Sequence, residues 1–367
     1  MVGKNSWLGG VLFAGLLACS ASDSDDAGST EGAGAGSSGT PSGNGAGATT
    51  GNGGSGASGT ASTGSSGTGS GAAPGDEVLV AFIGDSGNGS EFKSVLDLAM
   101  AEDVDAIIHN GDFDYGLDPD GFFATVDGKV GGDFPYFASV GNHDAPSWSE
   151  YSVYIKAHME AAGATVDNDD FSDQKFAFFW RSLHFVFVGE NGQNDEFASF
   201  IDEQLDPAAD EWKICGWHKN QEAMQIGGKG DEMGWDVYEN CRMNGAIVTT
   251  GHEHSYERTK TLTNMTAQQV DGSCSDPASV CVSPGRTIAI VSGLGGVGIR
   301  DQERCQPSTA PYGCNGEWAS IYASDQNATY GALFIRFNAG GDTKKAEGYF
   351  KNVDGAVVDQ FTIQRGE

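Results

Sequence analysis

Two histidines one residue apart, His252 and His254, stand directly after a short apolar run at residues 246–250. The run is rich in β-branched residues and short enough to be a buried strand, so both histidines leave the end of one strand. Residues two apart in an extended segment point the same way. Two imidazoles that point at one place can begin a metal site, although such pairs also occur as ordinary surface or core histidines.

Polar residues also follow four upstream candidate strands, and they are Asp85, Asp112, Tyr115, Asn142, His143 and His218. Carboxylates, a phenol, an amide oxygen and imidazoles suit iron, zinc or manganese better than a metal that prefers thiolates. The ligands are too many for one ion, and one carboxylate that bridges two ions would divide them evenly. A lone Asp at a strand end more often caps a helix, so the prediction depends on all these residues occurring together.

The segments that carry these residues alternate between strand, polar loop and helix. Apolar runs predict strands at residues 78–83, 106–109, 134–140, 176–180, 183–188, 212–217 and 246–250. Helical spacing predicts helices at residues 91–102, 149–162, 197–205 and 233–243. This alternation indicates an α/β fold, in which ligands bind beyond the carboxyl ends of the strands. Later short strands predict a second sheet packed on the first, at residues 287–291, 333–337, 345–350 and 357–363.

The composition excludes several kinds of partner. The chain has 367 residues, with 51 acidic against 20 basic side chains and a formal charge of −31. Such a surface repels nucleic acid and anionic lipid, which argues against either as a partner. A small anionic substrate would need cations in its site to reverse the local field. The oligomeric state is left open.

The first nineteen residues predict export. Lys4 gives a weak positive start, and residues 7–18 form an apolar core too short to span a bilayer. Residues 16–19, Leu-Leu-Ala-Cys, resemble a bacterial lipobox, which implies cleavage before Cys19 and lipidation of its thiol. The protein would then be a cell-envelope lipoprotein at the cell surface or outer membrane; ordinary signal cleavage and free secretion is the alternative. Residues 20–76 predict a disordered Gly/Ser-rich linker, and 77–367 the folded domain.

Six further cysteines support export. An even number of cysteines in an oxidising compartment allows three disulfides, among fifteen possible pairings. Proximity favours Cys274 with Cys281 and Cys305 with Cys314, which leaves Cys215 for Cys241.

Five motifs together resemble the calcineurin-like metallophosphoesterases, and they span about residues 77–365. In order and rough spacing they are Gly84-Asp85-Ser86-Gly87, Gly111-Asp112-Phe113-Asp114-Tyr115, Gly141-Asn142-His143-Asp144, a lone His218, and Gly251-His252-Glu253-His254. The position of Tyr115, and Ser255-Tyr256-Glu257-Arg258, resemble the purple acid phosphatase branch. The resemblance implies a four-layer α/β/β/α sandwich of two packed mixed sheets, with the metal site at the carboxyl ends of the strands.

The resemblance also implies a division of the ligands between two ions. Asp85, Tyr115 and His254 would hold one, which is ferric iron in that branch. Asn142, His218 and His252 would hold a divalent zinc, iron or manganese ion, and Asp112 would bridge the two. The implied reaction is hydrolysis of a phosphate monoester by a metal-bound hydroxide. His143 would stabilise the transition state or protonate the leaving group, and Asp144 would orient His143.

One departure from the branch leaves the substrate class open. Purple acid phosphatases usually carry another histidine about ten residues after the position of His218, and residues 219–229 contain none. Lys219 or Lys229 could supply a positive charge instead. The first alternative is therefore a phosphodiesterase on the same scaffold. The second is a metal-containing surface binding protein without turnover, against which the presence of His143 beside all seven ligands argues.

Overall fold

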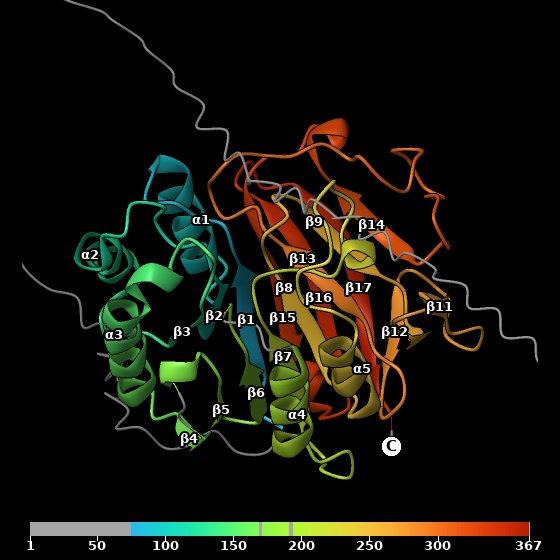
Figure 1. Cartoon of the computed structure of the whole chain (residues 1–367), viewed down its shortest axis with the longest axis horizontal. Coiled ribbons are helices and arrows are strands. Elements are labelled where there is room, and N and C mark those ends of the chain that lie inside the picture. Colours follow the sequence, from blue (N-terminus) through green and yellow to red (C-terminus); the bar gives the residue numbers. More distant parts are fainter. Residues whose placement is uncertain (1–74, 169–170, 191–193, 367) are drawn as a thin grey trace, which may run out of the picture. The chain divides into compact units, whose positions relative to one another are not determined.

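The computed structural model describes residues 75–168, 171–190 and 194–366 (Figure 1). The predicted export segment, residues 1–19, and all but the last two residues of the predicted linker, residues 20–76, lie outside these ranges. Within the described ranges, no helix is both long enough and apolar enough to cross a membrane.

One mixed sheet contains the first three strands of the domain. Its order is β12 (Ser279–Val282), β17 (Val357–Arg365), β16 (Lys345–Asn352), β15 (Gly331–Phe337), β1 (Val78–Ile83), β2 (Ala106–Asn110) and β3 (Tyr136–Ser139). Strands β1, β2 and β3 are parallel, whereas β15 pairs with β1 in the antiparallel sense. The carboxyl ends of β1, β2 and β3 therefore lie at one edge of the sheet.

A second mixed sheet contains the strands that precede the histidines. Its order is β14 (Trp318–Tyr322), β9 (Tyr256–Thr259), β13 (Ala289–Ser292), β8 (Ile247–Thr250), β7 (Trp212–Gly216), β6 (Leu183–Phe187), β5 (Phe176–Trp180) and β4 (Thr165–Asn168). Strands β6, β7, β8 and β13 are parallel, and β5 and β6 form the predicted hairpin. A small separate sheet pairs β10 (Leu262–Asn264) with β11 (Gln269–Val270).

Helices cover the outer face of each sheet. The first sheet carries α1 (Ser90–Ala101), α2 (Pro119–Val130) and α3 (Trp148–Ala161), and the second carries α4 (Asn194–Gln204) and α5 (Asp236–Met243) (Figure 1). Single 3₁₀ turns occur at Ala145–Ser147, Phe171–Asp173, Glu222–Met224, Ser324–Gln326 and Ala339–Gly341. The four predicted helices are present, with ends that differ by a few residues. Helix α2, which begins with Pro119 and is capped by the Asp118 side chain, was not predicted.

The inner faces of the two sheets pack against each other and form the main core. Trp212 of β7 meets Phe337 of β15 with ring centroids 5.4 Å apart, and Tyr256 of β9 stacks on Phe350 of β16 at 4.3 Å. These side chains belong to one cluster of buried apolar residues that also includes the inner sides of α1, α2 and α3. The predicted α/β fold with two packed mixed sheets is confirmed.

The division of strands between the sheets differs from the prediction. We expected the early strands in one sheet and the late strands in another, but each sheet combines both kinds. Strand β1 is buried along its whole length, so both of its edges must find backbone hydrogen-bond partners within the protein. The early strand β2 supplies one edge and the late strand β15 supplies the other.

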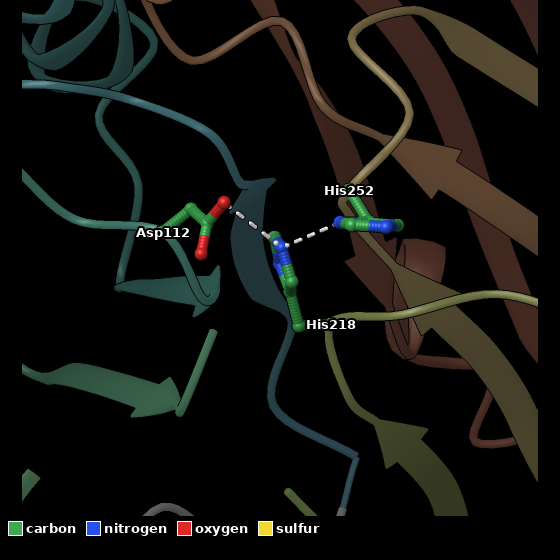
Figure 2. Close-up of side chains that lie close together, drawn as sticks. All are labelled: Asp112, His218 and His252. Atoms are coloured by element: carbon green, nitrogen blue, oxygen red, sulfur yellow. Dashed lines mark hydrogen bonds and ion pairs between the residues drawn. The ribbon is translucent and has the colours of Figure 1, made fainter. Parts of the chain in front are cut away.

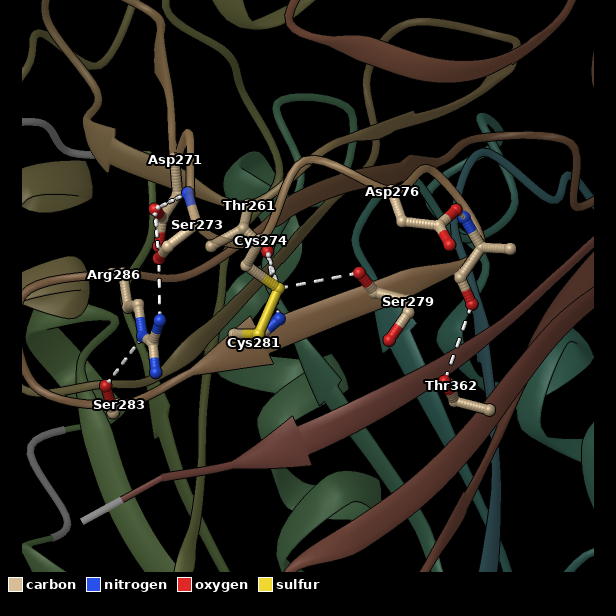
Figure 3. The surroundings of a disulfide bond; sticks show 11 residues. Thr261, Asp271, Ser273, Cys274, Asp276, Ser279, Cys281, Ser283, Arg286 and Thr362 are labelled. Atoms are coloured by element: carbon tan, nitrogen blue, oxygen red, sulfur yellow. Dashed lines mark hydrogen bonds and ion pairs between the residues drawn. A yellow bond between two sulfur atoms is a disulfide. The ribbon is translucent and has the colours of Figure 1, made fainter.

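Three disulfides are present among the described residues, and they are the pairs that proximity favoured. Cys215–Cys241 joins β7 to α5, and Cys305–Cys314 closes a loop after β13. Figure 3 shows the third, Cys274–Cys281, beside Thr261, whose hydroxyl accepts a hydrogen bond from the backbone N–H of Cys281 at 2.9 Å. The disulfide pairing predicted from proximity is thus confirmed.

Candidate metal centre

The polar residues singled out in the sequence gather at the carboxyl ends of the strands. The loops after β1, β2 and β3 carry five of them, namely Asp85, Asp112, Tyr115, Asn142 and His143. The loops after β7 and β8 carry the other three, namely His218, His252 and His254. Tyr115, Asn142 and His143 are half-buried and the other five are buried, so the cluster opens to solvent on one side.

Asp112, His218 and His252 form one close group, in which the side chains point toward one another (Figure 2). Nε2 of His218 lies 3.1 Å from Oδ2 of Asp112 and 3.1 Å from Nδ1 of His252. These residues come from three different loops, so the packing of the two sheets brings them together.

Asp85, Tyr115 and His254 form a second group beside the first. The Tyr115 hydroxyl lies 3.4 Å from Oδ1 of Asp85 and 3.3 Å from Nε2 of His254. Nε2 of His254 lies 3.3 Å from the same Asp85 oxygen. The groups adjoin each other, because Nε2 of His218 is 3.9 Å from Oδ1 of Asp85. The division of the ligands between two ions, with Asn142 in the second set and Asp112 as the bridge, stays a prediction.

Asn142 and His143 complete the open side of the cluster. Oδ1 of Asn142 is buried and has no hydrogen-bond partner among the described residues. The backbone N–H of His143 donates to Oδ1 of Asp112 at 2.9 Å, and its ring lies 4.4 Å from the ring of Tyr115. The His143 side chain is 27 % exposed, and its Nε2 is 4.0 Å from Oδ2 of Asp112. The side chain of His143 is therefore accessible to a substrate, and Oδ1 of Asn142 is available as a ligand.

The contacts of Asp144 among the described residues are with backbone groups, and its predicted role in orienting His143 stays a prediction. Its buried carboxylate accepts three backbone N–H groups, from Asp112 at 2.7 Å, Phe113 at 2.8 Å and Gly141 at 2.9 Å. These bonds join the loop after β2 to the loop after β3. The physical reason is that the loops leave several buried N–H groups unpaired, and an adjacent carboxylate can satisfy them together. Asp144 thus positions Asp112 and Asn142 through the backbone.

Four of the seven predicted ligands have a left-handed backbone. The φ angles are 57° for Asp85, 59° for Asp112, 58° for Tyr115 and 70° for His252. Such conformations cost about 1 kcal/mol or more for a residue other than glycine, and they concentrate at functional sites. The contacts of the surrounding loops must hold these conformations in place, since they are uncommon in residues other than glycine.

A glycine at the strand end permits the closest approach between two of these loops. A Cβ atom on Gly141 would lie 2.2 Å from both the backbone nitrogen and Oδ1 of Asp112. Gly141 therefore allows the loop after β3 to pack directly on the Asp112 carboxylate, which is why the motif places glycine before Asn142.

The remaining ring nitrogens of two histidines are occupied by acceptors. Nδ1 of His218 lies 2.7 Å from the carbonyl oxygen of Asn110, and Nε2 of His252 lies 2.7 Å from Oε2 of Glu232. These contacts leave the other nitrogen of each ring turned toward the cluster. Glu232 was not predicted from the sequence, because it lies in an irregular loop without a pattern that distinguishes it.

Burial and charge shift the pKa values inside the cluster. Burial alone lowers the pKa of His218, but the carboxylates of Asp112 and Asp85 outweigh it and raise that pKa to about 10. Burial lowers the pKa of His252 to about 4, against the opposing effect of Glu232. Burial, together with Asp85 and Asp112, raises the pKa of the Tyr115 phenol. The two carboxylates therefore favour positive charge within the cluster.

This donor set fits two cations. Two buried carboxylates, three imidazoles and a phenol lie close together, and the buried amide oxygen of Asn142, in the neighbouring loop after β3, has no hydrogen-bond partner among the described residues. Such oxygen and nitrogen donors are those that iron, zinc and manganese prefer. A cation beside Tyr115 would also lower the pKa of the phenol and so favour its ligating, ionised form.

The two lysines that could replace the missing histidine are engaged by protein groups. Nζ of Lys219 forms ion pairs with Glu232 at 2.9 Å and Glu190 at 3.2 Å. Nζ of Lys229 donates to the carbonyl oxygen of His252 at 2.8 Å. Both ammonium groups therefore hold the loop after β7 in place and have a structural role.

Comparisons with known proteins show which family and which folds this chain resembles. The family model of the calcineurin-like phosphoesterases matches residues 78–256. A purple acid phosphatase from yellow lupin (Lupinus luteus) seeds has a similar structure, with 17 % identity, a TM-score of 0.58, and coverage of 80 % of this chain and 55 % of the lupin chain. A structure of PhoD is 11 % identical, with a TM-score of 0.50 and coverage of 80 % of this chain and 71 % of that one. No curated protein matches the sequence. The chain spans about half the length of the lupin enzyme, and at these identities the likeness concerns the fold alone.

Proposed function

Because the chain belongs to the calcineurin-like metallophosphoesterase superfamily, we propose that it is an exported phosphatase that uses two metal ions to hydrolyse phosphate monoesters. The observation that carries this proposal is the pair of adjoining ligand groups, Asp112 with His218 and His252, and Asp85 with Tyr115 and His254. The first of these groups contains the Asp112 carboxylate, which is suited to bridge two ions.

The ligands divide by chemistry between the two positions. Asp85 and Tyr115 offer anionic oxygens and His254 an imidazole, a set that suits a hard trivalent ion such as ferric iron. Asn142, His218 and His252 offer a neutral amide oxygen and two imidazoles, which suit divalent zinc, iron or manganese. When bound, the ions would supply Lewis acidity and lower the pKa of water in the site.

The remaining residues would orient the substrate and move a proton. His143 lies at the open side, beside Asp112 and over the Tyr115 ring, and can donate a hydrogen bond to the phosphoryl group or a proton to the leaving oxygen. Asp112 accepts the backbone N–H of His143, so the position of that proton donor depends on the bridging carboxylate.

Export and lipid anchoring are part of the same proposal. Three disulfides are typical of a protein that folds in an oxidising compartment. The sequence of residues 1–19 supports attachment to the cell envelope through Cys19, with free secretion as the alternative. Mass spectrometry of the protein recovered from cells would find a lipidated Cys19 at its N-terminus if the anchoring proposal is right, and an unmodified mature N-terminus if it is wrong.

The reaction is tested with a chromogenic phosphate monoester and the matching diester, measured on the purified metal-loaded protein over a range of pH. We expect faster turnover of the monoester. An Asp112→Asn variant should lose turnover by at least about 1000-fold, because catalysis by residues that act together falls steeply when one is removed. Retention of both metals and full activity by that variant would contradict the mechanism.

The two alternatives correspond to other outcomes of the same measurement. Faster diester turnover would make the protein a phosphodiesterase, an alternative that the missing histidine keeps open. Bound metals without cleavage of either ester would favour a metal-containing binding protein. A visible charge-transfer band in the wild type that disappears in Tyr115→Phe would identify ferric iron at the Asp85–Tyr115–His254 group, whereas a colourless active protein would exclude it.

A further inference from the structure

The loop between β7 and α5, residues 217–235, holds the segment that carries His252. Nδ2 of Asn220 donates to the carbonyl oxygen of Gly251 at 2.7 Å, and Nζ of Lys229 donates to the carbonyl oxygen of His252 at 2.8 Å. A third contact reaches the imidazole itself, since Nε2 of His252 lies 2.7 Å from Oε2 of Glu232. One loop therefore fixes the backbone and the ring of the same residue.

The contact with Glu232 determines which nitrogen of His252 faces the cluster. An ionised carboxylate only accepts hydrogen bonds, so Nε2 carries the proton and donates it to Glu232. The lone pair is then on Nδ1, which is the nitrogen that lies 3.1 Å from Nε2 of His218. Without Glu232, the ring could adopt the other tautomer, or turn over and present Nε2 instead.

Glu232 is itself held in place on its other oxygen. Oε1 of Glu232 lies 2.9 Å from Nζ of Lys219, which also pairs with Glu190 at 3.2 Å. The backbone N–H of Glu232 donates to the carbonyl oxygen of Asn220 at 3.1 Å. The Glu232 side chain is 25 % exposed and that of Glu190 is 6 % exposed, so the ion cluster lies at the inner rim of the site.

The ends of the loop are also fixed. The buried disulfide Cys215–Cys241 brackets it, with one cysteine in β7 and the other in α5. Trp217 and Tyr238, next to these ends, pack edge to face at 4.9 Å, and the Tyr238 hydroxyl donates to Oδ1 of Asn220 at 3.1 Å. These contacts at its ends give the loop, and Glu232 within it, a defined position.

We propose that Glu232 is a positioning residue that fixes His252 with Nδ1 as its metal-binding nitrogen, and that Lys219 and Glu190 hold Glu232 for this task. The inference rests on the two-metal function proposed above. Carboxylates behind ligating histidines commonly raise metal affinity by ordering the ring, and their removal typically costs 10–100-fold in affinity or activity.

The test measures zinc binding to the demetallated full-length protein by competition with a chromophoric chelator. Glu232→Ala should weaken zinc binding about 10–100-fold. Glu232→Gln keeps an oxygen that can accept from Nε2, and its loss should stay below about tenfold. The matched control is Glu222→Gln, because Glu222 lies on the same loop with an exposed side chain, and its zinc affinity should equal that of the wild type.

A second measurement separates ring positioning from general loss of structure. Nitrogen NMR of histidine-labelled protein without metal should show His252, assigned by its absence in His252→Asn, as the tautomer protonated on Nε2. Glu232→Ala should show a mixture of tautomers, and Glu232→Gln should restore the single form. A merely structural role for Glu232 would leave this signal unchanged.

The outcomes distinguish this inference from the proposed function. Wild-type protein that binds two zinc ions, with Glu232→Ala binding them equally tightly and with the same His252 tautomer, would overturn the role of Glu232 alone. Wild-type protein that binds no zinc would overturn the two-metal function and this inference with it. The proposal is supported if Glu232→Ala is the variant that shows both weakened zinc binding and mixed His252 tautomers.

Discussion

The two sides of the candidate metal centre are held in different ways. The oxygen side follows β1, β2 and β3 of the first sheet and consists of Asp85, Asp112, Tyr115 and Asn142. The imidazole side follows β7 and β8 of the second sheet and consists of His218, His252 and His254. Both sides lie at the carboxyl ends of parallel strands, but the interactions that position them are not of the same kind.

Backbone contacts position the oxygen side. The Asp144 carboxylate joins the loops after β2 and β3 through three N–H groups, and Asp112 accepts a further N–H from His143. Three of the four ligands on this side, Asp85, Asp112 and Tyr115, have a left-handed backbone. Short loops of this kind have little conformational freedom, so the loss of one of these hydrogen-bonded contacts affects the position of all ligands on the oxygen side.

Acceptors on the ring nitrogens position the imidazole side. The carbonyl oxygen of Asn110 holds His218, and Glu232 holds His252. Glu232 belongs to a longer loop, which an ion cluster and the Cys215–Cys241 disulfide keep in place. Carboxylates can thus be fixed by the strand ends themselves, whereas the imidazoles of His218 and His252 each also have a protein partner on the second nitrogen.

The largest effect is expected from removing the Asp144 carboxylate, whose three hydrogen bonds join two loops on the oxygen side. Asp144→Ala would leave three buried N–H groups without an acceptor, and each such loss costs about 1–3 kcal/mol. We expect the free energy of unfolding to fall by about 3–5 kcal/mol in Asp144→Ala and by less in Asp144→Asn, which keeps one oxygen. Urea unfolding of the demetallated proteins measures this without a contribution from bound metal.

The control for this measurement is Asp97→Ala. Asp97 forms an exposed ion pair with Lys129 at 2.6 Å, and such pairs contribute about 0–1 kcal/mol. Equal losses of stability in Asp144→Ala and Asp97→Ala would show that the Asp144 carboxylate does not hold the oxygen side.

A smaller effect is expected from opening the disulfide on the imidazole side. A double change of Cys215 and Cys241 to alanine should lower the free energy of unfolding by about 2–4 kcal/mol. It should also weaken zinc binding, because the bracketed loop carries both His218 and Glu232. Urea unfolding and chelator competition measure the two effects.

The matched control removes Cys274 and Cys281 instead. This disulfide has a sequence separation of 7 against 26 for Cys215–Cys241, so chain entropy predicts a loss about 1 kcal/mol smaller. Cys281 lies in β12 and Cys274 precedes that strand, so neither cysteine belongs to either side of the metal centre, and zinc affinity should not change. The same loss of zinc affinity in both double variants would remove the special role of Cys215–Cys241.

The sequence predicted the members of both sides because each motif is local. A buried run followed by glycine and a ligand can be recognised within a few residues, as with Gly251 and His252. The allocation of strands to sheets could not be predicted, because the pairing of β1 with β15 joins opposite ends of the domain. The backbone partners of Asp144 could not be predicted, because its hydrogen bonds come from N–H groups that every residue except proline carries.

Glu232 shows the limit most clearly. Its role depends on one side-chain contact across an irregular loop, and an acidic residue in such a loop is ordinary in a chain with 51 acidic side chains. Only the folded chain places its carboxylate behind His252. Residues that position a ligand are thus harder to predict than the ligands, because they need no fixed spacing from them.

We propose that this protein holds two metal ions, one in each group of ligands. Anomalous diffraction from crystals of the metal-loaded wild-type protein is the decisive test of this proposal. Two anomalous peaks that adjoin Asp112 are expected, one at Asp85, Tyr115 and His254, and the other at Asn142, His218 and His252. A single peak, or peaks elsewhere in the molecule, would contradict it.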